Sequence, residues 1–282
     1  MSFQNAHLLY LSEVFLSIIV PEHVENPAWL LCYNLLNKGN GEEMMSRFRE
    51  VFPKGHVVLP VIHVESLEQT LRNVAIAMEA QADGVFLINH YIRADELLDI
   101  HAAVADAFPD CWIGVNCLDL DPHEVFARVS HRVDGIWTDN AMIDEHAVEQ
   151  PEAEAVLQLR RSRGWRGLYF GGVAFKYQRH VDDVASAAVR ARAFMDVVTT
   201  SGAGTGIAAS VEKIRRMKTA LGDFPLAIAS GITPENVVDY LPHSDCYLVA
   251  TGISKSFEEL DPPLVQRLVH TVRSFDLRDE GS

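Results

Sequence analysis

The chain has 282 residues, a formal net charge of -15 and 48% hydrophobic residues. This length and composition suit one large globular α/β domain, whereas the acidic charge argues against binding to nucleic acid or to an anionic membrane. The four cysteines are scattered without C-x-x-C spacing, which gives no indication of a zinc motif or a disulfide framework and leads us to expect a cytoplasmic protein.

The first 54 residues do not fit the pattern of the rest. Residues 26–31 and 42–52 look helical and are separated by a glycine-containing turn at 38–41. The apolar run 8–20 is too short to span a bilayer, is interrupted by Glu13 and follows no basic residue, so we expect neither a membrane span nor a signal peptide. Residues 1–54 are therefore predicted to be a helical extension, either a lid across one end of the main domain or an oligomer contact.

Residues 55–282 alternate apolar strand-like runs with amphipathic helical segments. The strand-like runs are continuously apolar, as expected of parallel strands covered by helices on the outside. Eight such units favour a (β/α)8 TIM barrel as a single domain, and an open doubly wound sheet is the alternative, although its G-x-G-x-x-G fingerprint is absent. The expected strands are 57–64, 84–89, 112–118, 135–138, 168–175, 196–200, 225–229 and 246–250, and each is expected to be followed by a helix.

Small-residue turns follow the last two expected strands. One contains Ser230 and Gly231, and the other contains Thr251, Gly252 and Ser254. Turns of this kind expose backbone N–H groups that can bind a phosphate, and the loops after strands seven and eight often do so in TIM barrels. The simpler alternative is that these glycines only make tight turns.

Polar residues at the carboxyl ends of the strands should converge at one mouth of a barrel. His63, Asp139 and Lys176 are the candidates for proton transfer and charge stabilisation. Each has a simpler alternative: His63 as a core histidine, Asp139 as a loop cap and Lys176 as a surface lysine. Further residues at strand ends are predicted to contact the substrate, namely His90, Asn116, Thr200, Ser201 and Gly202.

A divalent metal is a further candidate ligand of this mouth. Imidazole and carboxylate donors that metal ions accept lie at the expected strand ends, but they lack the local spacing of a known metal motif. The donors are His63, Glu65, His90, Asp119 and Asp139. The sequence therefore predicts no cofactor with certainty.

Several of these stretches resemble the BtpA/SgcQ family of TIM-barrel proteins, which is placed with the ribulose-phosphate-binding barrels. The similar stretches are Pro60 to His63, Gly114 to Asn116, Phe175-Lys176, Thr200 to Gly206, Ser230 to Val237 and Thr251 to Lys255. The resemblance extends over about residues 56–275 and implies the barrel fold, but the loop after His63 departs from the Leu-Pro-Gly pattern of the family. Family habit also suggests a homodimer. The family links its members to photosystem assembly or sugar metabolism and implies no single reaction.

Two functions remain open from the sequence. The first is an enzyme acting on a small phosphorylated metabolite, a phosphosugar or nucleotide-like compound, as an isomerase, lyase or sugar-group transferase. The second is a non-catalytic barrel that binds a ligand or partner as an assembly or stability factor.

Overall fold

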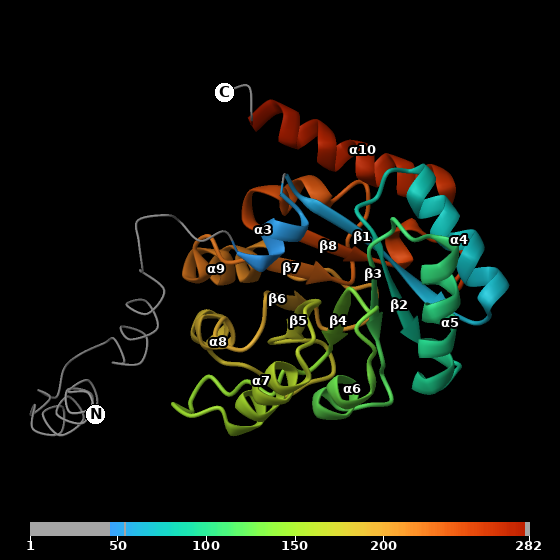
Figure 1. Ribbon diagram of the computed structural model, residues 1–282. Helices are drawn as coiled ribbons and strands as arrows, with labels where there is room; N and C mark the ends of the chain where they lie inside the picture. The colour runs from blue at the N-terminus through green and yellow to red at the C-terminus, as the bar shows by residue number, and fades with distance from the viewer. Residues whose placement is uncertain (1–45, 54, 280–282) are drawn as a thin grey trace, which may run out of the picture. The chain divides into compact units, whose positions relative to one another are not determined.

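The computed structural model describes residues 46–53 and 55–279, in which eight parallel strands form a closed barrel in sequence order (Figure 1). The chain therefore has the predicted (β/α)8 architecture, and the open sheet is excluded. Residues 1–45, most of the predicted N-terminal extension, lie outside the described residues. The strands are β1 (Val57–Val64), β2 (Val85–Asn89), β3 (Ile113–Asn116), β4 (Gly135–Thr138), β5 (Leu168–Gly172), β6 (Val197–Ser201), β7 (Leu226–Ala229) and β8 (Cys246–Val249).

Helices follow most of the strands and surround the barrel. None of the helices in the described part of the chain is long and apolar enough to cross a membrane. They are α3 (Arg47–Val51), α4 (Leu67–Glu79), α5 (Ala94–Ala107), α6 (Pro122–Arg128), α7 (Pro151–Arg163), α8 (Val184–Ala191), α9 (Val211–Leu221) and α10 (Pro262–Asp279).

The helix expected after β7 is replaced by two short 3-10 turns, η2 (Val237–Asp239) and η3 (Leu241–His243), and a third, η4 (Thr251–Ile253), follows β8. Two features oppose an α-helix after β7. The side chain of Asn236 accepts from the backbone N–H of Thr233 and donates to the carbonyl of Gly231, so it competes with helical hydrogen bonds. Pro242 lacks the N–H that a continuing helix would use.

The inside of the barrel is filled by side chains that alternate along the strands. Phe86 of β2 packs against Trp112, Trp137 and Phe170, with ring centroids 5.2, 5.7 and 5.1 Å away. Below this layer the ring of Phe48 on α3 lies 6.4 Å from that of Phe170. The N-terminal end of the barrel is thus closed by α3, and the interior is a packed core rather than a channel.

An aspartate stands just before each even-numbered strand, and its carboxylate accepts a hydrogen bond from a backbone N–H at the start of the preceding odd strand. Arg273, Arg160 and Lys218 neutralise three of these four carboxylates. The four bonds fix neighbouring strands together at the N-terminal end. They join Asp83 to Val58, Asp134 to Ile113, Asp196 to Tyr169 and Asp245 to Leu226, over 2.7, 2.9, 2.7 and 2.9 Å.

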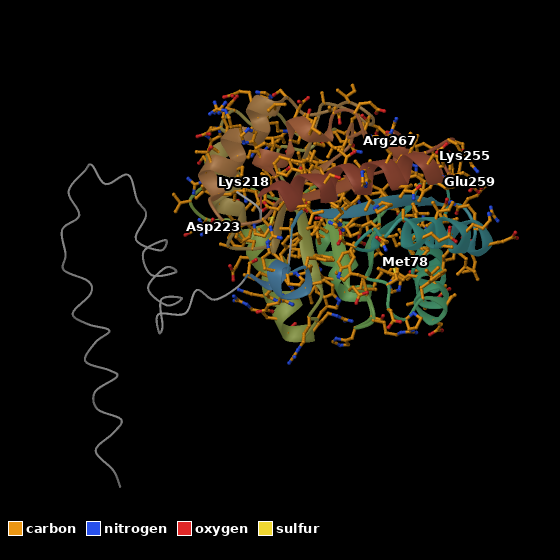
Figure 2. The ribbon with its side chains drawn as sticks, turned by 90° about the horizontal axis from the view of Figure 1, so that it is seen from above. Met78, Lys218, Asp223, Lys255, Glu259 and Arg267 are labelled. Atoms are coloured by element: carbon orange, nitrogen blue, oxygen red, sulfur yellow. The ribbon has the colours of Figure 1, made fainter. Side chains whose placement is uncertain are left out.

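The two ends of the barrel are well separated. In Figure 2, Lys218 and Asp223, which precede β7, lie at one end of the barrel, and Lys255 and Glu259, which follow β8, lie at the other. The carboxyl ends of the strands, where the candidate residues were predicted, therefore face away from the stabilising aspartates.

Candidate active site

A cavity of about 150 Å³ opens at the carboxyl ends of the strands. It is lined by six residues that were predicted from the sequence, namely His63, His90, Asp139, Lys176, Ser230 and Thr251. Its other lining residues are Val61, Ile88, Leu118, Trp137, Tyr177, Thr205, Gly206, Leu248 and Ala250. The three predicted catalytic side chains are thus brought to one place by β1, β4 and β5.

Lys176, four residues after the end of β5, spans part of this cavity. Its Nζ donates a hydrogen bond to Ser230 Oγ over 3.1 Å and lies 5.6 Å from the centre of the Phe175 ring. Its backbone N–H donates to Ser201 Oγ over 2.8 Å, which fixes the start of the side chain. Lys176 is therefore an ordered cation in the cavity wall rather than a freely solvated surface lysine.

Asp139 follows β4 and is held by Asn116 from the end of β3. Asn116 is buried, and its Nδ2 donates to Asp139 Oδ1 over 3.0 Å. Burial raises the pKa of Asp139, while the Asn116 hydrogen bond and the charge of Lys176 oppose this rise. A carboxyl with a raised pKa can give and take protons closer to neutral pH.

His63, at the carboxyl end of β1, is only 6% exposed. Its Nδ1 lies 2.7 Å from the carbonyl oxygen of Phe257, and its ring packs against His90 and Phe257, at centroid distances of 4.8 and 3.8 Å. Because the carbonyl can only accept, Nδ1 carries the proton and Nε2 is left as an acceptor. Burial, followed by the neighbouring His90, lowers the pKa of His63 to about 4, so the ring is neutral at pH 7.

Sequence reasoning missed Trp137, which lines the same cavity. It is 3% exposed, and its indole N–H has no hydrogen-bond partner within the described residues. A buried donor without a partner costs about 1–3 kcal/mol unless another group accepts from it. The alternation of side chains along β4 gives the missing signal, since Trp137 lies two residues before Asp139 and thus on the same side of the strand.

Phe257 and Tyr177 were also missed, and neither carries a local sequence signal. Phe257 lies in the segment after β8 and covers His63, while the hydroxyl of Tyr177 accepts from Thr205 N over 3.1 Å. Each contact joins residues that are far apart in the sequence, so only the folded chain brings them together.

The predicted phosphate-binding glycines have a packing role. At Gly231, which has a φ of 73°, a Cβ would lie 2.1 Å from the backbone nitrogen of Ala208. At Gly252, a Cβ would lie 1.9 Å from the carbonyl oxygen of Ile232. The loops after β6, β7 and β8 thus pack backbone against backbone, which requires glycine whether or not a phosphate binds there.

Five other predicted residues do not line the mouth cavity, and one of them, Asn116, instead binds the carboxylate of Asp139. The hydroxyl of Thr200 donates to the carbonyl of Ala174, and that of Ser254 donates to the carbonyl of Ala250, so both bind the backbone. Ser201 and Gly202 line a second, larger cavity of about 500 Å³ between the loops after β5 and β6.

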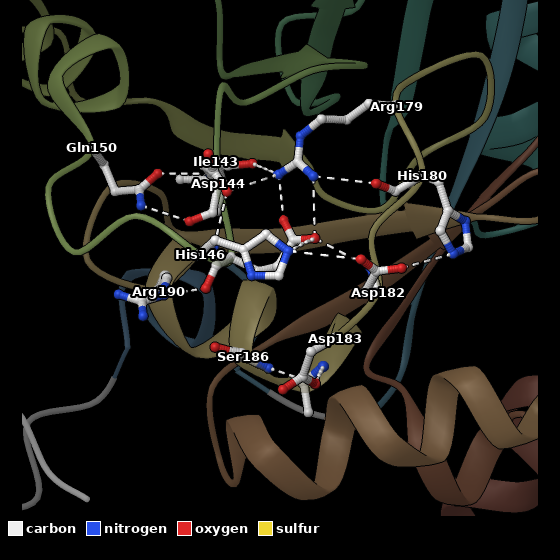
Figure 3. Close-up of polar contacts among 12 residues, drawn as sticks. Ile143, Asp144, His146, Gln150, Arg179, His180, Asp182, Asp183, Ser186 and Arg190 are labelled. Carbon is white, nitrogen blue, oxygen red and sulfur yellow. Dashed lines mark hydrogen bonds and ion pairs between the residues drawn. The ribbon is translucent and has the colours of Figure 1, made fainter.

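The predicted set of metal donors is not gathered into one group. The carboxylate of Asp119 instead accepts from Asn89 Nδ2 over 2.7 Å and from Ala94 N at the start of α5 over 3.3 Å. Within residues 46–53 and 55–279, the group of three donors whose atoms all lie within 4.8 Å of one another consists of Glu145, His146 and Asp182. His146 and His180 approach Asp182 from opposite sides (Figure 3).

The mouth therefore combines the ammonium group of Lys176, the carboxyl of Asp139 with its raised pKa and the neutral imidazole of His63, beside which the ring of His90 lies. The ammonium of Lys176 can bind the anionic group of a ligand. The carboxyl of Asp139 and the imidazole of His63 can then transfer protons to or from that ligand. This combination suits proton-transfer chemistry on a small anionic compound.

A family model described as the BtpA family matches residues 102–274. Because this is more than half of the chain, the chain belongs to the BtpA family. The match extends from α5 into α10 and so includes β3 to β8, whereas the resemblance was expected from residue 56. A comparison with curated proteins finds no match.

Solved structures with the same fold include enzymes in complex with phosphorylated compounds. (S)-3-O-geranylgeranylglyceryl phosphate synthase from Thermoplasma acidophilum, in complex with its substrate sn-glycerol-1-phosphate, is 16% identical with a TM-score of 0.60 over 82% of this chain and 100% of that chain. Phosphoribosyl anthranilate isomerase from Thermus thermophilus is 15% identical with a TM-score of 0.55 over 78% and 99%. A phosphoribosyl anthranilate isomerase in complex with reduced 1-(O-carboxyphenylamino)-1-deoxyribulose 5-phosphate is 13% identical with a TM-score of 0.53 over 77% of this chain and 99% of that chain. At these identities the likeness shows the fold.

Proposed function

We propose that this BtpA-family barrel is an enzyme that acts on a small phosphorylated metabolite, a phosphosugar or nucleotide-like compound, at the carboxyl end of its strands. The observation that carries the proposal is the hydrogen bond between Lys176 Nζ and Ser230 Oγ in the wall of the cavity that also contains Asp139 and His63. The reaction is an isomerisation, a lyase reaction or a transfer of a sugar group.

The phosphate group binds beside Lys176 and Ser230. The ammonium provides charge-assisted hydrogen bonds, and the serine hydroxyl can donate to a phosphate oxygen once Lys176 turns toward the anion. Backbone N–H groups around Gly231 and Gly252 complete the binding site, since glycine at these positions allows a close approach. Thr251, which lines the same cavity, is the remaining hydroxyl contact.

Asp139 and His63 carry out the proton transfers. A base in such a reaction removes a proton from one substrate atom, and an acid supplies one to another atom. Asp139 suits either role because its pKa is raised, and His63 can accept a proton at Nε2. The indole N–H of Trp137 donates to a substrate oxygen, which would satisfy a buried donor.

The structurally similar enzymes support a phosphorylated substrate in general terms. One is bound to sn-glycerol-1-phosphate and another to a deoxyribulose 5-phosphate compound. Because TIM barrels catalyse many different reactions, these similar structures support the class of ligand but do not indicate the reaction.

Thermal unfolding with and without phosphorylated compounds tests the proposal. The wild-type chain and the variants Lys176→Met and Lys255→Met are compared with inorganic phosphate, glycerol 1-phosphate, ribose 5-phosphate and nucleoside monophosphates. A ligand at a hundred times its Kd adds about 2.7 kcal/mol, so we expect a shift of several degrees in the wild type. The shift should disappear in Lys176→Met. It should persist in the control Lys255→Met, because Lys255 is an exposed residue after β8.

Turnover is then followed by ³¹P NMR with each stabilising compound. Conversion that is lost in Asp139→Asn while binding remains supports the enzyme. Binding without conversion of any stabilising compound would favour the non-catalytic barrel, and a wild-type chain stabilised by none of the compounds would contradict the phosphate site itself.

A further inference from the structure

The mouth cavity is small for a ligand site. Its volume of about 150 Å³ lies below the roughly 300–1,000 Å³ of typical ligand pockets. The second cavity, of about 500 Å³, lies beside it and shares the wall residues Lys176 and Tyr177. A metabolite of typical size whose phosphate occupies the mouth must extend beyond this cavity. The adjacent second cavity can take the atoms that the mouth does not hold.

Lys213 of α9 gives the second cavity its electrostatic character. Its Nζ donates to the carbonyl oxygens of Ala174 and Ser201 over 2.6 and 2.7 Å, and none of the ion pairs among the described residues involves it. Burial lowers its pKa to about 8. The ammonium carries three protons, of which the two carbonyls use two, so one proton is left for a ligand.

The remaining charged residues of this wall do not offset Lys213. Among the described residues, no aspartate or glutamate lines the second cavity, and the guanidinium of Arg179 is bound by the Glu145 carboxylate, Asp144 and the carbonyls of Ile143 and His180 (Figure 3). A third cavity of about 350 Å³ between the loops after β4 and β5 is lined by Asp144 and Glu152 as well as Arg179, so two carboxylates oppose the binding of an anion there. The second cavity, which has Lys213 and no carboxylate of the described residues in its wall, suits a negatively charged group better than the third.

Ser201 connects the two lysines. Its hydroxyl accepts from the backbone N–H of Lys176, and its carbonyl accepts from Lys213 Nζ. Lys176 then extends to Ser230 in the mouth, while Lys213 lies in the wall of the second cavity. The end of β6 thus holds one ammonium group for each cavity.

We propose that the second cavity binds a second anionic group of the same ligand, a carboxylate or a phosphate, through Lys213. The substrate class is then a phosphorylated compound with a second negative group several atoms from the first. This inference rests on the proposed phosphate site in the mouth.

Isothermal titration calorimetry with matched ligands tests it. Ribose 5-phosphate carries one anionic group, 6-phosphogluconate adds a carboxylate, and ribulose 1,5-bisphosphate adds a phosphate. We expect the wild-type chain to bind at least one of the two doubly anionic ligands about 10-fold or more tightly than ribose 5-phosphate. Which of the two gains more identifies the second group as a carboxylate or a phosphate.

The variants show whether Lys213 causes the gain. Lys213→Gln keeps an N–H donor for the carbonyls but removes the charge, so it should abolish the 10-fold gain while leaving the affinity for ribose 5-phosphate unchanged. Lys213→Arg should retain most of the gain, and Lys255→Gln, on an exposed segment, should retain all of it.

Equal wild-type affinity for all three ligands would overturn the second anion site while leaving the mouth site intact. A gain that persists in Lys213→Gln, or an equal loss of all three affinities in that variant, would also overturn it. Binding of none of the three ligands to the wild type would overturn the proposed function and this inference together.

Discussion

The ammonium nitrogen of Lys176 lies 3.1 Å from the hydroxyl oxygen of Ser230, and Ser230 holds a φ of 72°. Residues other than glycine rarely adopt this left-handed conformation, which costs on the order of 1–3 kcal/mol. Gly231 follows with a φ of 73°, so the chain makes two successive left-handed residues at the end of β7. Such strain is typical of functional sites, and here it brings the serine hydroxyl to the lysine.

Replacing Ser230 by glycine should separate ligand binding from stability. Ser230→Gly removes the hydroxyl but relieves the strained φ, so the free energy of unfolding should stay within about 1 kcal/mol of wild type. Phosphate affinity should fall about 5-fold or more, because a hydrogen bond to a charged group is lost. Urea unfolding and calorimetry measure the two quantities, and an unchanged affinity would remove Ser230 from the phosphate site.

The pKa of Asp139 should respond to its two neighbours. Burial raises this pKa, whereas the hydrogen bond from Asn116 and the charge of Lys176 lower it. Asn116→Ala and Lys176→Met each remove a group that stabilises the carboxylate, so each should raise the pKa of Asp139 further. Carboxyl ¹³C NMR titration follows the shift, with Lys255→Met as the control. A fall of the pKa in either variant would contradict the described contacts.

His63 should make stability depend on pH. Its pKa is about 4 in the folded chain, against the ordinary histidine value of 6.5, so the unfolded chain binds more protons between these two values. The contribution of His63 to stability is full above pH 6.5 and is lost as the pH falls toward 4, by up to about 3 kcal/mol.

Denaturant unfolding of the wild type and His63→Asn at about pH 7 and pH 4.5 measures this contribution. Burial also lowers the pKa values of His90 and His101, so the informative quantity is the difference between the two proteins. The wild type should lose more stability than the variant on acidification, and identical losses would contradict the assignment.

Asp196 should stabilise the barrel without affecting ligand binding. Its carboxylate accepts from Tyr169 N and pairs with Arg160, whose side chain is 7% exposed. Asp196→Ala leaves that buried charge unpaired, so we expect a loss of about 3–5 kcal/mol of unfolding free energy. Because Asp196 lies at the opposite end of the barrel, phosphate affinity below the unfolding temperature should stay at the wild-type value.

The sequence predicts the fold well because buried parallel strands and capped helices leave local patterns. Asp121 and Glu124, for example, have the spacing of a capping box, and they form one at the start of α6. The segment after β7 was predicted wrongly because Thr233-Pro234-Glu235 resembles a helix start, while the side chain of Asn236 and the missing N–H of Pro242 shorten the helix to 3-10 turns.

The site is predicted in part. Strand ends predict that His63, Asp139 and Lys176 meet at one mouth, and the three residues do line the same cavity, since the barrel brings every strand end to one mouth. They cannot show that Phe257 covers His63 or that Lys213, the third residue of α9, lines a cavity, because these contacts join parts of the chain that are far apart in sequence. Thr200 shows the same limit, since its strand position predicts a role but its hydroxyl binds the carbonyl of Ala174.

The most direct test of the phosphate site is a crystal structure of the full chain with sn-glycerol-1-phosphate. We predict a phosphate group within hydrogen-bond distance of both Lys176 Nζ and Ser230 Oγ, with the remainder of the molecule directed toward Asp139. A phosphate bound away from these two residues, or a mouth without the ligand at a concentration that saturates binding in solution, would contradict the proposed site.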